Sequence, residues 1–559
     1  MLVFSISSCG LSGLARTLMR LCLLLVIMSS AATSSAASTG DRTTVGGYNE
    51  STGTLVLPLA QEPRTLNTLT AESVGYTAQL LAHVQEGLMR YDRRRQLAGG
   101  VAESWKLTPD SMQFVLRADA KWQNGEPVTA LDFVFAWQQL VSPDNASPSA
   151  NLASPILNAS RIAAGELPKS ALGVTAVSES ELLVRLEHPC AWCLKLMTNP
   201  VFYPVHQGFY ESRGEHYATA PKDHLANGAY QLSGWERGKN IRLARNKNYW
   251  RAGSVAIANL HFDYIGIDAK TALNLFRAGE IAVAGLDRDT IPDALGLGYR
   301  IRTFPSGHLF HIQFSHLPGM ASANENLRRA ISLVVDKTEL VNRVVASPGT
   351  RVADSMFHDW LTVEDAIFLQ ARPVTPHRVD LDMARKHLVL ARQELGVTGD
   401  IELSLTINDV DLSHRVAQYL QAQLMDNLGI RVTIDPQITQ IMVNKWRQGV
   451  SDMTLITWPV DVEDPMDQIS FMGNPDFRAV FRGLYAGDDM AALYLRNRNA
   501  VALEERLDAT RAVHDLFTER VTVFPLFESY GAVVMNPRLR GFVWQPVRGY
   551  ADYRYLTIQ

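Results

Sequence analysis

Two cysteines three positions apart are the residues of this sequence whose spacing most directly suggests chemistry. Cys190 and Cys193 form a Cys-x-x-Cys pair, and His188 and His206 lie nearby in the chain. Four such side chains could ligate a metal ion or haem, and the two thiols alone could act as a redox pair. The structural alternative is a local disulfide or two inert thiols. Because the histidine spacing matches no regular zinc pattern, and Pro189 only partly fits the start of a redox helix, we expect the structural alternative and no metal site.

Short catalytic motifs are absent from the sequence. It contains no Walker loop, no Gly-x-Ser-x-Gly elbow, no His-Glu-x-x-His pair and no dinucleotide-binding Gly-x-Gly-x-x-Gly. Carboxylate pairs can still assemble from distant positions, so this absence counts only modestly against an enzyme. We expect no catalytic site and no cofactor.

The elements that must position any site follow an alternating pattern in the second half of the chain. Residues 401–407 and 430–434 are β-rich runs, and a helical pattern over 413–428 separates them. Two strands joined by a helix of this length are predicted to be parallel. Residues 452–458 form a continuous apolar run, which is typical of a strand buried on both faces. The predicted fold class is therefore α/β, and the sequence contains no internal repeat.

The stretch from residue 102 to residue 138 carries the clearest local signals. Residues 113–117 alternate as a short strand, and Asn124-Gly125 is a strong turn signal. Thr129 and Asp132 have the spacing of a capping box, which predicts a helix over residues 130–141. Near the C-terminus, a helix over 503–519 is predicted to lead into a strand over 521–527.

The N-terminus has the features of a secretory signal peptide. Arg16 and Arg20 precede the apolar run 21–28, and small residues fill positions 29–38. An apolar core of eight residues is far shorter than the ~20 that a membrane-spanning helix needs. We therefore predict a signal peptide over residues 1–37 and a mature protein that is soluble outside the cytoplasm.

Composition limits the class of protein further. Residues 38–53 are rich in Ser, Thr and Gly and are predicted to be a flexible leader, with order beginning near Thr54. The composition, 47% hydrophobic and 20% charged, is that of an ordinary globular chain, long enough for roughly three to four domain-sized units. A formal net charge of -4 leaves no basic footprint for nucleic acid or anionic lipid.

Three landmarks along the chain resemble a known family. The first comprises Val101–Trp105, Phe114–Arg117, Ala120–Trp122, Pro127–Ala130 and Asp132–Val134. The second comprises Asn227–Tyr230 and Leu243–Trp250, and the third runs from Arg328 through Asp336. In order and spacing they resemble the family 5 extracellular solute-binding proteins, the oligopeptide, dipeptide and nickel binders of ABC importers. The resemblance spans essentially the whole mature chain.

The resemblance implies a two-lobed periplasmic-binding-protein-like fold with an additional inserted subdomain. Lobe I would contain both ends of the mature chain, namely residues 54–88, 206–308 and 532–559. The inserted subdomain would comprise residues 89–205, and lobe II would comprise residues 309–531.

The segment Thr457–Asp461 gives the most specific indication of a ligand site. It resembles the family's Gly-Trp-x-x-Asp segment, in which the Asp of peptide binders receives the α-ammonium of the peptide. By this resemblance Asp461 would bind the ligand, Trp458 would line the cleft, and Glu72 falls near a family acidic residue that can meet the ligand. Asp461 also follows a predicted buried strand, where ligands of open α/β sheets bind. Alternatively, Asp461 caps a helix and Trp458 fills the core.

The sequence departs from the oligopeptide binders at three positions. Ser149 stands where they carry an aromatic residue, and Leu455 and Trp446 stand where they carry arginines. Peptide length and sequence preference therefore cannot be carried over. The nearest basic candidates for a ligand carboxylate are His414, Arg415 and Arg447.

The function implied by the resemblance is that of a periplasmic receptor. It would capture peptides in an interlobe cleft and deliver them to an ABC permease and ATPase complex in the inner membrane, as a monomer and without catalysis. The alternative is the same scaffold binding another solute, such as haem, nickel, an opine or a sugar conjugate, and a ligand without an amine does not need Asp461. A third class is an enzyme or a periplasmic chaperone.

Overall fold

A computed structural model describes residues 44–71, 75–474, 477 and 480–559. The predicted signal peptide lies outside the described residues. The prediction of a flexible leader was wrong for residues 44–53, because β1 (Thr44–Val45) and β2 (Tyr48–Asn49) form a hairpin that pairs with β3 (Thr54–Leu59). The turn of this hairpin is Gly46-Gly47, and both residues have positive φ. A Cβ at Gly47 would lie 2.1 Å from the backbone nitrogen of Ala282, so these glycines serve close packing and a tight turn, not flexibility.

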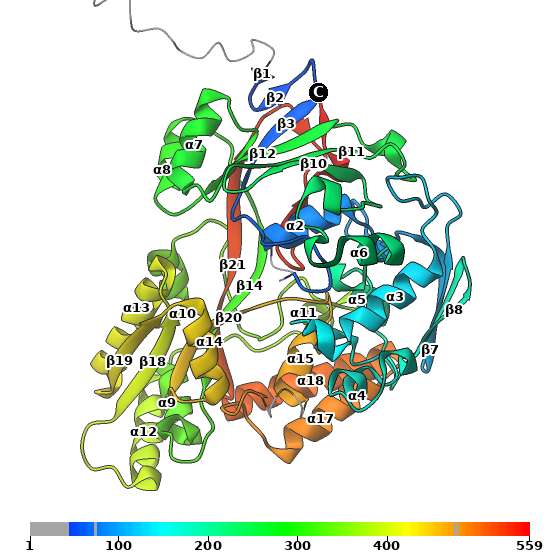
Figure 1. Ribbon diagram of the computed structural model, residues 1–559. Coiled ribbons are helices and arrows are strands. Elements are labelled where there is room, and N and C mark those ends of the chain that lie inside the picture. The colour runs from blue at the N-terminus through cyan, green and yellow to red at the C-terminus, as the bar shows by residue number, and fades with distance from the viewer. Residues whose placement is uncertain (1–43, 72–74, 475–476, 478–479) are drawn as a thin grey trace, which may run out of the picture.

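A six-stranded sheet forms the upper part of the molecule in Figure 1. Its order is β1-β2-β3-β12-β11-β10, in which β12 (Asn259–Ile265) is parallel to β3 and antiparallel to β11 (Asn240–Arg245), and β10 (Tyr230–Glu236) forms the edge. The helices of this region are α2 (Gly75–Val84), α6 (Gln207–Arg213), α7 (Ala269–Ala278) and α8 (Thr290–Gly296).

A four-stranded antiparallel sheet lies to one side of it, in the predicted inserted subdomain. Its order is β6 (Ala102–Thr108), β7 (Ser111–Leu116), β9 (Glu181–Arg185) and β8 (Val174–Ser178). The other elements are β4 (Met89–Tyr91), β5 (Leu97–Gly99), α3 (Ala130–Leu140), α4 (Ala159–Ala163) and α5 (Cys193–Leu196). The Asp132 carboxylate accepts a hydrogen bond from Thr129 N at 2.8 Å, so α3 begins where the capping-box spacing predicted.

A seven-stranded mixed sheet runs through the middle of the molecule. The order along it is β13 (Val283–Leu286), β21 (Val523–Met535), β14 (Arg302–Phe314), β20 (Met453–Pro459), β18 (Glu402–Asn408) and β19 (Arg431–Gln437), and β15 (Arg351–Val352) pairs with β21. Strands β18 and β19 are parallel, as predicted, and α13 (Asp411–Leu428) joins them. In Figure 1, β14 and β21 connect the upper part to the lower part.

The lower part contains most of the helices that cover this sheet. They are α9 (Glu325–Val334), α10 (Lys337–Glu339), α12 (Leu381–Leu395), α14 (Thr439–Gln448), α15 (Met466–Gly473), α17 (Asp488–Asn499) and α18 (Leu503–Arg520). Smaller elements are α11 (Phe368–Ala371) and the pair β16 (Thr362–Val363) and β17 (Ala366–Ile367). The chain then returns to the upper part with β22 (Leu539–Arg540), β23 (Val543–Gln545), β24 (Tyr550–Asp552) and β25 (Thr557–Ile558).

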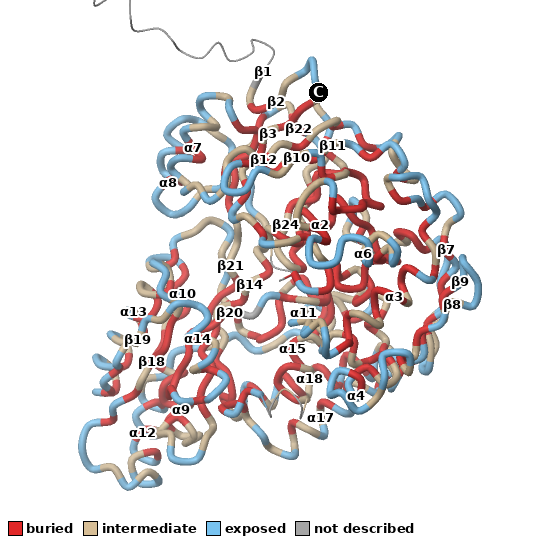
Figure 2. The backbone as a smooth tube through the Cα atoms, viewed as in Figure 1, coloured by how far each residue is buried: buried red, intermediate tan, exposed pale blue. Residues whose placement is uncertain are grey.

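Buried residues form one large cluster and two smaller ones. The large cluster joins Leu55 of β3 and Trp122 of the predicted subdomain to Met466 and Phe471 of α15, and Figure 2 shows buried chain through the centre of the molecule. A second cluster packs between the lower sheet and its helices, and a third lies around α7 and α8. Within the described residues, none of the helices combines the length and the apolar character that a membrane span requires.

Candidate functional site

Three carboxylates follow the end of β20. Asp461, Glu463 and Asp464 lie in a stretch that we call the acidic segment (residues 461–464), directly after the strand ends at Pro459. The parallel neighbour of β20 is β18, and its antiparallel neighbour is β14. The acidic segment therefore lies beyond the carboxyl end of β20, which is where ligands of open α/β sheets bind.

Asp461 forms an ion pair with a cation from the C-terminal region. Its Oδ1 atom lies 2.9 Å from Nη2 of Arg548, and the side chains of Asp461 and Arg548 are 26% and 7% exposed. Arg548 also donates its backbone N–H to the carbonyl of Val460 at 3.1 Å. Its φ of 64° is in the left-handed region, and Gly549 follows with a φ of 62°. A tight turn between β23 and β24 therefore positions the guanidinium against Asp461.

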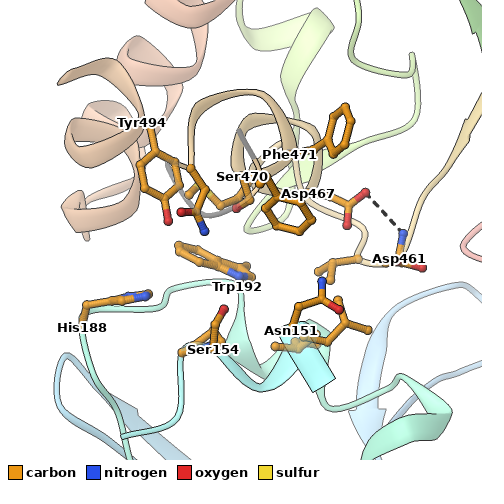
Figure 3. A pocket seen from close by; sticks show the side chains of 16 residues that line it. Asn151, Ser154, His188, Trp192, Asp461, Asp467, Ser470, Phe471 and Tyr494 are labelled. Carbon is orange, nitrogen blue, oxygen red and sulfur yellow. Dashed lines mark hydrogen bonds between the residues drawn. The ribbon is translucent and has the colours of Figure 1, made fainter. Parts of the chain in front are cut away.

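A cavity of about 80 Å³ lies beside Asp461. One wall comes from the predicted inserted subdomain and the other from the acidic segment, α15 and α17, as Figure 3 shows. Its aromatic lining includes Trp192, Phe471 and Tyr494, and its polar lining includes Asn151, Ser154, His188 and Ser470. Burial, as the largest cause, lowers the pKa of His188, so this imidazole is neutral at pH 7.

The other two carboxylates of the acidic segment also meet cations from across the molecule. Glu463 lies 3.5 Å from Arg95, and Asp464 lies 3.9 Å from Lys195. Lys195 Nζ further donates hydrogen bonds to the carbonyls of Thr362 and Glu463 at 2.8 and 2.9 Å and to Thr362 Oγ1 at 2.7 Å. We call Arg95, Lys195 and Arg548 the bridging cations, because each reaches the acidic segment from outside the predicted lobe II.

Burial shifts the pKa of two of these groups in opposite directions. It lowers the pKa of Lys195, against the opposing effects of Asp464 and Glu463. It raises the pKa of Glu463, against the opposing effects of Arg95 and Lys195. The charges of Lys195 and Glu463 are thus partly removed from water, and each charged form is stabilised by the oppositely charged groups that face it. Asp464 has a second partner within the lower part, the buried Arg506, at 2.7 Å.

The volume of the cavity beside Asp461 limits the size of ligand that fits it. A cavity of about 150 Å³ holds one benzene molecule, whereas that beside Asp461 measures about 80 Å³. This cavity is therefore smaller than a peptide needs, and a ligand of that size requires more space beside Asp461.

The two cysteines of the Cys-x-x-Cys pair form a disulfide, with an S–S distance of 2.00 Å. The structural alternative expected from the sequence includes this pairing. The disulfide closes the turn before α5, so it fixes the loop that carries Trp192 into the cavity and Lys195 toward the acidic segment. Among the described residues, no group of three or more His, Cys, Asp or Glu side chains is placed to hold a metal ion.

The remaining residues predicted from the sequence have different outcomes. The backbone of Trp458 pairs with Leu309 of β14, but its side chain is not among those that the structure describes. Glu72 lies outside the described residues. The three basic candidates do not line the cavity beside Asp461: His414 contacts Asp409, Arg415 contacts Asp411, and Arg447 lies over the ring of Phe481.

Sequence reasoning missed all three bridging cations. Each lies in a loop or a one-turn helix, Arg95 at the end of the run Arg93-Arg94-Arg95, and none has a motif that separates it from the other 50 Lys and Arg residues of the chain. The turn residues Arg548-Gly549 were a signal for a tight turn, but not for its position against Asp461.

Comparison with known protein families identifies one match over most of the chain. The model of the family described as bacterial extracellular solute-binding proteins, family 5 (middle), matches residues 96–477.

Individual relatives and solved structures are similar over comparable lengths. The periplasmic murein peptide-binding protein MppA of Escherichia coli is 26% identical over 506 residues, which cover 90% of this chain and 92% of the relative. The periplasmic oligopeptide-binding protein OppA of Salmonella typhimurium is 28% identical over 402 residues, covering 69% and 71%. The substrate-binding domain of an oligopeptide ABC transporter from Bacillus anthracis superposes with a TM-score of 0.75 at 25% identity, covering 92% of this chain and 99% of that one.

Proposed function

The chain belongs to family 5 of the bacterial extracellular solute-binding proteins, and we propose that it captures peptides between two lobes and delivers them to the membrane permease of an ABC importer. The observation that carries the proposal is the position of Asp461. Its carboxylate lies at the wall of a cavity between the predicted inserted subdomain and the predicted lobe II, and it is paired with a cation from the predicted lobe I. A peptide ammonium is a second cation of suitable size for the same carboxylate.

Binding would then proceed by exchange of partners at Asp461. In the closed arrangement, Arg548 neutralises Asp461. When a peptide enters, its ammonium takes the place of the guanidinium, so that the half-buried carboxylate keeps a counterion throughout. The proposal includes Trp458 and Glu72 as further ligand contacts.

The architecture supports a hinge between the predicted lobes. β14 and β21 are 13 residues each and pair with each other. The boundaries predicted between lobes I and II, at 308/309 and 531/532, fall within these two strands. Bending of a paired strand ribbon would separate the acidic segment from the bridging cations, as in other hinge closures. It would also divide the large buried cluster that joins α15 to the upper part and to the predicted subdomain.

The remaining parts of the proposal concern place and partners. We propose that residues 1–37 are a signal peptide that directs the chain to the periplasm. There it would act as a monomer that meets the permease and ATPase complex of the inner membrane. The family is one of receptors and not of enzymes, and the proposed role requires no catalysis.

Mass spectrometry of ligand retained on the purified protein tests this function. The protein is isolated from the periplasm without denaturation, and the bound fraction is released with acid. We expect short peptides with free amino termini. Recovery of a stoichiometric non-peptide solute would overturn the proposal.

The second candidate is a receptor for a solute that is not a peptide, and the Arg548 contact is the observation that favours it. Because Arg548 already neutralises Asp461, the site does not require a ligand cation. Haem, nickel complexes, opines and sugar conjugates are the classes to test under this alternative, and retained ligand distinguishes them directly.

A further inference from the structure

A second cavity lies within the predicted lobe II, away from the acidic segment. Its volume is about 200 Å³, and its walls are the end of α18, the start of β21 and the loops at residues 354–356 and 375–377. None of the residues that line it also lines the cavity beside Asp461. A function of this second cavity would therefore be separate from the proposed peptide site.

The walls of the second cavity are largely apolar. Phe517 and Phe524 contribute aromatic rings, and Met356, Val521, Val523 and Pro525 contribute aliphatic surface. Phe517, Val523 and Phe524 are all at most 4% exposed, so packing holds the walls in place. An apolar cavity of about 150 Å³ accepts benzene, so a cavity of about 200 Å³ accommodates one aromatic ring with a small substituent.

Lys337 contributes a buried cation to this apolar cavity. It is 4% exposed, and it begins α10, which Asp336 caps. Its Nζ atom donates a hydrogen bond to the carbonyl of Ala353 at 2.8 Å and lies 4.6 Å from the centre of the Phe524 ring. The carboxylate of Asp354 is 3.8 Å away, beyond hydrogen-bond distance. An ammonium carries three donors, so in the described part of the chain Lys337 has donors to spare for an anionic group.

The two histidines of the cavity are neutral at pH 7. Burial, the largest cause in each case, lowers the pKa of His377 and of His514. His377 Nε2 lies 2.9 Å from the carbonyl of Ser332 and therefore carries the ring proton. Burial also lowers the pKa of Lys337, to about 8, so Lys337 is still mainly protonated at pH 7. The cavity thus presents one cation among apolar walls. Its one carboxylate, Asp354, forms an ion pair with Lys337 at 3.8 Å and accepts a hydrogen bond from the backbone N–H of His377 at 3.0 Å.

We propose that this cavity binds a small aromatic carboxylate of about the size of benzoate, with the ring between Phe517 and Phe524 and the carboxylate on Lys337. A neighbouring cavity of about 420 Å³ shares four lining residues with this second cavity, namely Lys337, Asp354, Pro376 and His377. This shared wall gives a ligand a route from the surface to the ammonium, and it gives space for substituents on the carboxylate side.

Calorimetric titration compares benzoate with benzyl alcohol and benzylamine, which keep the ring and change the charge. We expect benzoate to bind at least tenfold more tightly than either of the other two. Crystals grown with 4-bromobenzoate would locate the ligand, and the anomalous signal of bromine is expected between Phe517 and Phe524. Equal affinity for the three compounds, or bromine only at another position, would overturn the proposal.

Lys337→Met removes the charge and keeps the length of the side chain, and it should lower benzoate affinity at least tenfold. The matched control is Lys445→Met, on α14, whose lysine pairs with Asp435 at 2.6 Å and does not line the cavity. Peptide binding should be the same in both variants and in wild type, so failure of this proposal is distinguishable from failure of the proposed function. If Lys337→Met does not fold, the proposal is tested on wild type alone, by the affinities for benzoate, benzyl alcohol and benzylamine and by the position of bromine in crystals with 4-bromobenzoate.

Discussion

Arg548 reaches Asp461 from the C-terminal region, and under the proposed function a ligand cation has to replace this contact. The pair is largely buried on the arginine side and partly exposed on the aspartate side. Pairs of this kind contribute little net free energy when they are exposed, and when they are buried the loss of one partner is costly because it leaves an unpaired charge. Under the proposed function, Arg548 is therefore an internal competitor for the ligand cation.

Replacement of this competitor gives the prediction at the residue scale. In Arg548→Gln the carboxylate of Asp461 loses its internal cation, so a peptide ammonium no longer has to displace it. We expect peptide affinity to rise by about threefold to tenfold, or about 0.7 to 1.4 kcal/mol. Isothermal titration measures the change, and Arg538→Gln, whose arginine pairs with Glu50 at 2.7 Å, is the control. A large fall in affinity would mean that Arg548 itself binds the ligand.

At the scale of elements, the disulfide loop shows how a structural feature supports the site. Cys190 and Cys193 are both buried, and the loop that they close places Trp192 in the cavity and Lys195 on the acidic segment. The contribution of such a small closed loop to stability is mainly its effect on the unfolded chain.

The double variant Cys190→Ser, Cys193→Ser tests this supporting role. A loop of four residues corresponds to about 2 kcal/mol of chain entropy, so the free energy of unfolding should fall by about that amount in a denaturant titration. Peptide affinity should stay within about threefold, because the packing of Trp192 and the hydrogen bonds of Lys195 remain. A normally folded variant that has lost peptide binding would instead identify the cysteines as part of the site.

The elements themselves were largely predictable from local pattern. The predicted strand 452–458 is β20 at 453–459, and the predicted helix 413–428 is α13 at 411–428. Apolar periodicity and caps are local signals, so one sequence suffices for them. The hairpin at 44–49 was missed because the Ser, Thr and Gly content of residues 38–53 predicted flexibility, and only the contact of Gly47 with Ala282 shows that this segment is packed.

The site was predictable only in part. The position of Asp461 follows from the end of a buried strand, which is local information. Its partner Arg548 is 87 positions away along the chain, and Lys195 reaches Glu463 across 268 positions. Contacts at such separations depend on how whole elements pack, and a single sequence carries no direct signal for them.

At the scale of the whole molecule, the bridging cations connect the predicted lobes without a ligand. Lys195 donates hydrogen bonds to the carbonyls of Thr362 and Glu463 and to the hydroxyl of Thr362. Lys195→Met should therefore favour the open form. In small-angle scattering, the radius of gyration of the ligand-free variant should exceed that of ligand-free wild type, and saturating peptide should reduce it. Lys239→Met, on an exposed turn, is the control. An unchanged scattering profile would count against closure through Lys195.

Buried histidines make the stability of the whole molecule depend on pH. Burial is the largest cause that lowers the pKa to about 4 for a set of five histidines, namely His83, His224, His308, His311 and His316. Between pH 6.5 and about 4 the unfolded chain binds a proton at each position and the folded chain does not. These histidines therefore make their full contribution to the free energy of unfolding above pH 6.5. Their contribution decreases as the pH is lowered through this window.

A single replacement measures how much one of these histidines contributes to the pH dependence. His224→Leu should reduce the pH dependence of the free energy of unfolding by about 1.4 kcal/mol per pH unit within this window, whereas His216→Leu, at an exposed position, should not change it. Denaturant titrations at a series of pH values measure the slope. The same slope in wild type and His224→Leu would show that His224 takes up its proton in the folded protein.

The most direct measurement of the central claim is a calorimetric titration of wild type and Asp461→Asn with a peptide identified from the retained ligand and with its N-acetylated form. If Asp461 receives the peptide ammonium, wild type should bind the free peptide and reject the acetylated one. The Asn variant should bind the free peptide more weakly by about two to three and a half orders of magnitude, because loss of one partner of a buried ion pair costs about 3 to 5 kcal/mol. Equal binding of both peptides by wild type, or an affinity of Asp461→Asn equal to that of wild type, would contradict the account.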